Sequence, residues 1–326
     1  MTGWRPVAEL VRLPAALTVP GDVLLGAAAA GWPFGRRTAG LIGASACLYW
    51  AGMAANDWAD RDVDALERPG RPIPSGRVSP AAAAVLAGAL TAAGVAVAGA
   101  VGGGRALRVA VPLAATVWAY DLRAKSTVAG PAVMAAARGL DVLLGAGGAA
   151  RALPAAATVA AHTAVVTGLS RTEAVGGDAK AARTALAGTL AVAVLAAAGP
   201  VLPARRGTAQ PTGSRLRRVP RRGLAAAGPV HPAGGVARSF AAVSVLRCVA
   251  GLGLAAAYAT VLGRAQLAAA RDPRPPVVQA AVAAGVLGVV PLEAALLARA
   301  GALPAAGGVA ALWPLARRLS RRVSPT

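Results

Sequence analysis

The sequence predicts an all-α membrane protein, a polytopic bundle of about nine transmembrane helices, and three features support this fold class. Of the 326 residues, 56% are hydrophobic and only 14% are charged, whereas soluble domains carry about 25% charged residues. The mean hydropathy is +0.57. Apolar stretches recur along the chain at lengths that suit a bilayer. This composition excludes a soluble globular enzyme, because there are too few charges to form its surface.

The apolar stretches predict the individual spans, each of which needs about 20 apolar residues. The qualifying segments lie near 7–30, 38–55, 80–101, 106–120, 129–149, 154–170, 184–202, 239–262 and 277–297. The stretch 302–315 is short and contains Pro304 and Pro314, so it is either a tenth span or a helix at the membrane interface.

The chain divides into three predicted parts. Residues 1–202 hold the first seven spans, and residues 239–326 hold the last two spans with a basic C-terminal segment. Between them, residues 203–238 carry eight Arg and no acid among Gly, Pro, Ser and Ala. Either this segment is a disordered low-complexity connection, or one of the adjoining helices does not span as drawn.

The net charge of +21 arises from 34 basic and 13 acidic residues. In a membrane protein this excess is a signal of topology rather than of nucleic-acid binding, so no nucleic-acid partner is expected. Arg and Lys are more frequent in the N-terminal segment and after the second, fourth and sixth spans than in the loops between. The distribution predicts a multi-pass protein of the cell membrane with those connections in the cytoplasm.

Acidic residues gather directly after the second span. Five of the thirteen acids lie there, at Asp57, Asp60, Asp62, Asp64 and Glu67. If the helix continues, the i, i+3, i+7 spacing puts Asp57, Asp60 and Asp64 on one face. Neighbouring carboxylates repel unless a cation neutralises them, and Mg²⁺ binds carboxylates together with phosphate oxygens. The cluster predicts a Mg²⁺-diphosphate site, with a solvated acidic loop as the alternative.

Basic residues accompany these acids. The Pro-rich loop 68–77 carries Arg68, Arg71 and Arg77, and the planar guanidinium fork suits phosphate. The segments 120–126 and 170–178 lie on the same predicted membrane face, so eight of the thirteen acids end the second, fourth and sixth helices. Helices that end on one side can surround one cavity.

At these residues the sequence resembles the UbiA superfamily of intramembrane prenyltransferases. The family's first motif, Asn-Asp-x-x-Asp-x-x-x-Asp, is matched by Asn56, Asp57, Asp60 and Asp64, and Arg-Pro-Ile-Pro-Ser-Gly-Arg follows at 71–77. The resemblance implies a helical bundle with a central cavity open toward the bilayer. It also implies that Mg²⁺ and a prenyl diphosphate bind there and that a lipophilic acceptor receives the prenyl group.

The resemblance assigns expected roles to individual residues. The metal ligands of the first motif would be Asp57, Asp60 and Asp64. The residues that support them or contact the substrate would be Asn56, Arg71, Tyr120, Lys125 and Arg171. The second motif departs from the usual Asp-x-x-x-Asp, since it offers Glu173 and Asp178 as further catalytic metal ligands, with two Gly between them.

The altered second motif leaves the function open. Its Leu-Ser-Arg-x-Glu form, at 169–173, resembles the UbiA-like branch called EboC, which is linked with export or tailoring of secondary metabolites. Mg²⁺-dependent prenyl transfer is the first hypothesis. The alternatives are phosphoribosyl transfer from its diphosphate to a polyprenyl phosphate, and a non-catalytic component of metabolite export.

Ionisable residues within the spans are expected to be functional or mutually paired. Arg138 and Asp141 are three residues apart in the fifth span, which favours an ion pair within one helix. Asp22 has no partner nearby in the sequence, so it could face the acceptor end of the cavity. Arg247 and Glu293 could neutralise each other between the last two spans.

Overall fold

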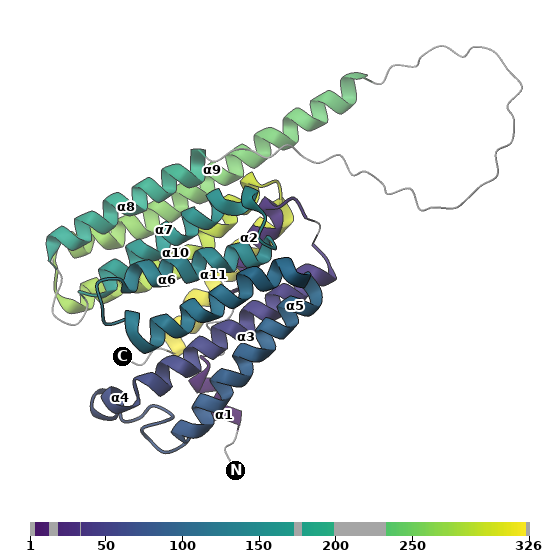
Figure 1. Cartoon of the computed structure of the whole chain (residues 1–326). Helices are drawn as coiled ribbons and strands as arrows, with labels where there is room; N and C mark the ends of the chain where they lie inside the picture. The colour runs from purple at the N-terminus through teal and green to yellow at the C-terminus, as the bar shows by residue number, and fades with distance from the viewer. Residues whose placement is uncertain (1–3, 13–18, 33, 173–177, 199–232, 324–326) are drawn as a thin grey trace, which may run out of the picture.

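The structure is a computed structural model, and it describes residues 4–12, 19–32, 34–172, 178–198 and 233–323 (Figure 1). Over these ranges all regular secondary structure is helical. The α-helices in chain order are α1 (Trp4–Leu10), α2 (Val19–Ala29), α3 (Arg36–Ala59), α4 (Arg61–Glu67), α5 (Pro80–Ala119), α6 (Gly130–Gly145), α7 (Leu153–Ser170), α8 (Ala179–Ala198), α9 (Ala233–Arg271), α10 (Pro275–Arg299) and α11 (Leu303–Val323). A π-helical turn, η2 (Tyr120–Ala124), follows α5, and a 3-10 turn, η3 (Ala150–Ala152), precedes α7.

Six helical segments in the described residues are long and apolar enough to cross a membrane. They are Arg36–Ala59, Pro80–Ala124, Ala150–Ser170, Ala179–Ala198, Ala242–Arg271 and Pro275–Arg299. The shorter apolar helix α2 lies among them. The chain is therefore an all-α multi-pass membrane protein, as the composition predicted. The stretch 302–315 forms part of α11, which is not one of the six.

The long helix α5 is a hairpin of two arms. At Gly103 the backbone leaves the helix with φ 65° and ψ −162°, a conformation that glycine adopts readily and other residues avoid. Trp118 Nε1 donates a hydrogen bond to Thr91 Oγ1 at 3.0 Å, so the arms lie side by side and antiparallel (Figure 1). The two spans predicted at 80–101 and 106–120 are confirmed as separate arms.

The first predicted span, 7–30, is not one continuous helix. α1 ends at Leu10 and α2 begins at Val19, while residues 13–18 lie outside the described part of the chain. Arg12 has φ +48°, a left-handed conformation that ends a right-handed helix. Its side chain turns to Asp57 instead, as the site below shows. The prediction of a single helix missed this break.

Small residues let the helices pack closely. A Cβ at Gly26 of α2 would collide with the backbone of α6, and a Cβ at Gly145 of α6 would collide with the backbone of α2 at Val23. At the other side of the core, every residue of α10 from Gly288 to Arg299 is buried. Close approach through glycine is typical of helix packing in membranes, and it brings the buried polar groups of α2, α6 and α10 together.

Candidate functional site

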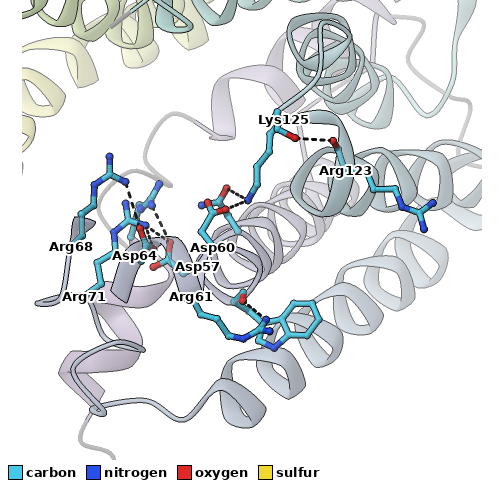
Figure 2. A network of polar contacts seen from close by, with 12 residues as sticks. Asp57, Asp60, Arg61, Asp64, Arg68, Arg71, Arg123 and Lys125 are labelled. Atoms are coloured by element: carbon cyan, nitrogen blue, oxygen red, sulfur yellow. Dashed lines mark hydrogen bonds and ion pairs between the residues drawn. The ribbon is translucent and has the colours of Figure 1, made fainter. Parts of the chain in front are cut away.

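The aspartate motif lies where α3 passes into α4. α3 ends at Ala59, Asp60 stands between the two helices, and α4 begins at Arg61. Asp57 Oδ1 and Asp64 Oδ2 both accept hydrogen bonds from Nη1 of Arg71, at 3.2 and 2.6 Å. Their side chains are only 6% and 3% exposed. Of the three carboxylates predicted to share a face, Asp57 and Asp64 do lie together (Figure 2). The helix does not continue as expected, because α3 ends at Ala59, and Asp60 is not part of this pair.

Asp60 pairs with a different cation. Lys125 Nζ lies 2.5 Å from Asp60 Oδ1 and donates to Asn56 Oδ1 at 3.5 Å. Lys125 directly follows the π-helical turn η2, so the end of α5 supplies a cation to the end of α3 (Figure 2). The predicted neighbourhood of the second and fourth helix ends is therefore present.

Two further arginines surround the paired carboxylates. Arg12 Nη2 lies 3.1 Å from Asp57 Oδ1, and Arg68 Nη1 lies 3.7 Å from Asp64 Oδ1. Asp62, by contrast, is 84% exposed and contacts Arg61 alone at 3.4 Å. The motif thus contains the two buried carboxylates of Asp57 and Asp64 and the partly exposed carboxylate of Asp60, all three paired with cations, while the exposed Asp62 lies outside this arrangement.

The Pro-rich loop that carries Arg71 is fixed against α1. Arg77 forms two hydrogen bonds with the Glu9 carboxylate, Nη1 to Oε2 at 2.5 Å and Nη2 to Oε1 at 3.0 Å. The hydrogen bond to Glu9 raises the pKa of Arg77 above its usual value. Arg77 also donates to the carbonyl oxygen of Gly70 at 2.6 Å. These contacts hold the backbone on both sides of Arg71.

The segment that follows α7 contacts the segment that follows α5. Arg171, at the end of α7, donates through Nη1 to the carbonyl oxygen of Thr127 at 2.5 Å, and its charge acts on the phenol of Tyr120. Asp178 is exposed, and its Oδ1 accepts a hydrogen bond from the backbone N–H of Lys180 at 2.9 Å, so it caps the start of α8. Glu173 lies outside the described residues, and the second metal pair stays a prediction.

Two residues of the site had no assigned role in the sequence. Arg12 counted there only toward topology, and nothing in its sequence neighbourhood pointed to Asp57. Asp121 lies in η2 and is buried, with its carboxylate toward Gly52 of α3. It interacts electrostatically with Lys125 and Asp60. Its position directly after Tyr120 in a segment already singled out was the available signal.

The carboxylates fit a divalent cation by their chemistry. In the part of the chain that the structure describes, no group of three His, Cys, Asp or Glu side chains converges as a metal site. However, Asp57 and Asp64 converge on one nitrogen of Arg71, so a cation position between two buried carboxylates exists. Hard carboxylate oxygens are the ligands that Mg²⁺ prefers. These two residues are therefore the best placed to hold it.

Deeper in the bundle, two expected ion pairs are wrong. Arg138 pairs with Asp22 and Glu293 on other helices, and Asp141 accepts hydrogen bonds from Ser45. Glu293 therefore does not pair with Arg247. Partner choice follows helix packing here rather than the spacing within one helix.

Comparison with known proteins identifies relatives of this chain. A digeranylgeranylglyceryl phosphate synthase of Natronomonas pharaonis is 40% identical over 92 residues, which cover 28% of this chain and 33% of the relative. In the curated relatives that match, the aligned stretch spans 34% of their length or less.

Two solved structures share the fold. One, from work on digeranylgeranylglyceryl phosphate synthase in membranes, has a TM-score of 0.59 at 14% identity, covering 93% of this chain and 100% of the other. The apo structure of a UbiA homologue from Aeropyrum pernix K1 has a TM-score of 0.55 at 17% identity, covering 83% and 96%. The profile of the UbiA prenyltransferase family matches residues 16–202. Since this match covers more than half of the chain and includes the aspartate motif, the chain belongs to the UbiA prenyltransferase family.

Proposed function

We propose that this protein is a Mg²⁺-dependent membrane transferase that moves a prenyl group from a prenyl diphosphate to a lipophilic acceptor. The observation that carries the proposal is the convergence of buried Asp57 and Asp64 on Arg71 at one end of a membrane-spanning bundle. Lys125 supplies a further cation beside it. Membership of the UbiA prenyltransferase family supports the same reaction class.

The site provides both halves of a metal-diphosphate complex. Asp57 and Asp64 would hold Mg²⁺, with Asp60 beside them. Arg12, Arg71 and Lys125 neutralise these carboxylates in the structure. When a metal takes over the carboxylates, the same cations can bind the phosphate oxygens that the donor brings, since guanidinium and ammonium groups both bind phosphate. Arg12, Arg71 and Lys125 would thus pair with the diphosphate instead of the aspartates.

In the reaction, the bond between prenyl C1 and the diphosphate oxygen breaks, and its electron pair leaves with the diphosphate. The allylic cation then forms a bond to the acceptor, which loses a proton. When bound, Mg²⁺ supplies Lewis-acid stabilisation of the leaving group. Arg71 and Lys125 would hold the diphosphate at the end of the bundle, and the apolar helices below would exclude water from the cation.

The names of the relatives guide the choice of substrates. Several curated relatives and the subject of one solved structure are digeranylgeranylglyceryl phosphate synthases. We therefore propose a glyceryl phosphate lipid as the first acceptor to test, with a geranylgeranyl donor. The distribution of Arg and Lys supports a cytoplasmic position of the aspartate motif.

The test uses the purified full chain with radiolabelled prenyl diphosphates of several lengths and a lipid extract. Transfer should require Mg²⁺ and stop with chelator. Asp64→Asn should lower it by more than about 100-fold, since the loss of Lewis-acid stabilisation raises the barrier by several kcal/mol. Asp62→Asn is the matched control, because Asp62 is exposed in the same motif, and it should keep wild-type transfer.

Three outcomes would reject the proposal. Wild-type transfer by Asp64→Asn would remove the motif from catalysis. Label transferred from phosphoribosyl diphosphate but from none of the prenyl donors would assign the other transferase reaction. Absence of transfer from every donor, with the folded protein present, would favour the non-catalytic export role.

A further inference from the structure

A cavity lined partly by arginines lies at the end of the bundle away from the aspartate motif. Its volume is about 520 Å³, and its wall includes Val109, Leu140 and Leu143. Arg105, Arg108 and Arg151 line it as well. It lies beside the start of α3, since Arg37 near that start stacks on Trp32, another lining residue. The aspartate motif follows the opposite end of α3 (Figure 1).

Within the described part of the chain, the three arginines have no partner for their charge. All three are exposed, and none of them forms an ion pair or a side-chain hydrogen bond with any other described residue. The stretches 30–37, 102–108 and 146–152, which meet at the cavity, contain no acid in their sequence. At the aspartate end, by contrast, Arg12, Arg68, Arg71 and Arg77 each pair with a carboxylate. This contrast points to an anion supplied from outside the chain.

The backbone builds the cavity in a defined way. Gly147 and Gly148 have φ +56° and +74°, so the chain turns sharply after α6. A Cβ at Gly147 would overlap the Trp32 ring and approach Arg37. Arg37 lies 3.9 Å above the centre of that ring, a favourable cation–π distance. The turn at Gly147 therefore packs against the Trp32 ring at one side of the cavity, and Arg105, Arg108 and Arg151 also line the cavity.

We propose that this cavity binds the headgroup phosphate of an anionic phospholipid. Guanidinium groups match phosphate oxygens in charge and geometry, so three of them around one cavity suit a phosphate group. Val109, Leu140 and Leu143 line the cavity beside the arginines, so an acyl chain would pack against them while the phosphate meets the guanidinium groups. A lipid fits both parts, whereas a free phosphate would use the arginines alone. Its binding would join the second arm of α5, which carries Arg105 and Arg108, to η3, which carries Arg151.

The test measures lipid retention by the purified full chain with native mass spectrometry and lipid-dependent melting. Phosphatidylglycerol should be retained and should raise the melting temperature more than phosphatidylcholine with the same acyl chains. The triple variant Arg105→Gln/Arg108→Gln/Arg151→Gln should lose this preference, with a fall in affinity of at least about tenfold. Arg36→Gln, an exposed charge at the same end that does not line the cavity, should keep it.

A plug variant separates a seated lipid from diffuse attraction to surface charge. Ala149 lines the cavity in extended backbone, with φ −71° and ψ 122°, so Ala149→Phe is sterically allowed by the backbone and fills the space. It keeps every arginine and should still abolish retention of phosphatidylglycerol. Melting in phosphatidylcholine should match wild type for both variants, which shows that they fold.

Three results would overturn the proposal. They are wild-type retention by the triple variant, wild-type retention by Ala149→Phe, and equal stabilisation by inorganic phosphate. The last would assign the site to a free anion.

Discussion

Arg138 Nη2 lies 2.9 Å from Asp22 Oδ2 and 3.4 Å from Glu293 Oε1, so one guanidinium of α6 joins α2 and α10 inside the bundle. Asp22 and Glu293 are fully buried. One turn further along α6, Asp141 accepts hydrogen bonds from Ser45 of α3 at 2.7 Å. The polar cluster therefore connects four helices. Removing one partner of a buried ion pair strongly destabilises a protein, because the other charge is left buried without compensation.

Removing the guanidinium should destabilise the fold. Arg138→Gln leaves Asp22 and Glu293 buried without a counter-charge, so the free energy of unfolding should fall by about 3–5 kcal/mol. Denaturant unfolding of the purified protein measures it. Adding Asp22→Asn should recover part of the loss, and the exposed control Arg36→Gln should change little. Wild-type stability of Arg138→Gln would show that the cluster does not hold the helices together.

Lys125 should contribute to donor binding. Lys125→Gln removes the charge beside Asp60 and should raise KM for the prenyl diphosphate at least about tenfold, because a hydrogen bond to a charged group contributes about 1.5–3 kcal/mol. Its melting temperature should stay near wild type. Arg123→Gln changes an exposed arginine of the same turn and serves as control. An unchanged KM with a lower melting temperature would make Lys125 a purely structural partner of Asp60.

The two acids of the altered second motif should differ. Glu173→Gln should raise the Mg²⁺ requirement or stop ionisation of the donor, since Glu173 comes soon after the apolar helix α7. Asp178→Asn should stay active, because Asn also caps a helix, whereas Asp178→Ala should lower stability by about 1 kcal/mol. Initial rates against Mg²⁺ concentration test this. If Asp178→Asn proves the more damaging variant, the assignment of the second ligand is wrong.

The orientation of the site can be measured directly. In a variant with Cys47 and Cys248 replaced, a membrane-impermeant thiol reagent should label Leu66→Cys from the cytoplasmic side. Leu66 is 87% exposed in α4. Arg36→Cys, at the other end of α3, should be labelled from the opposite side. Labelling of both positions from one side would contradict the topology drawn from the Arg and Lys distribution.

The turn inside α5 should depend on one glycine. Gly103→Ala places a side chain at φ 65° and ψ −162°, and such backbone strain costs about 1–3 kcal/mol. Gly104→Ala, at the next residue, has open space around its Cβ and no positive φ, so it should be neutral or slightly stabilising. Denaturant unfolding of the two variants measures the difference in their stability. Equal stability would mean that the turn relaxes.

Features that depend on composition and on spacing within one helix could be predicted before the fold was known. The shortage of charge required a membrane environment, and the apolar stretches placed most of the helices correctly. Helical spacing predicted one face for Asp57, Asp60 and Asp64, and the structure brings Asp57 and Asp64 together on Arg71, whereas Asp60 pairs with Lys125. The motif at Asn56–Asp64 also identified the family. None of these inferences needed to know which helices are neighbours.

Which charged side chains pair with one another depends on the packing of the helices. Asp141 is three residues from Arg138, yet the guanidinium pairs with Asp22 and with Glu293, the latter 155 residues away. Gly26 and Gly145 allow α2 to lie directly against α6, and Gly21 leaves room for the Glu293 carboxyl group. The break at Arg12 likewise brings that residue to Asp57. Partner choice in a buried site depends on the distance between helices, which close packing fixes and sequence spacing does not encode.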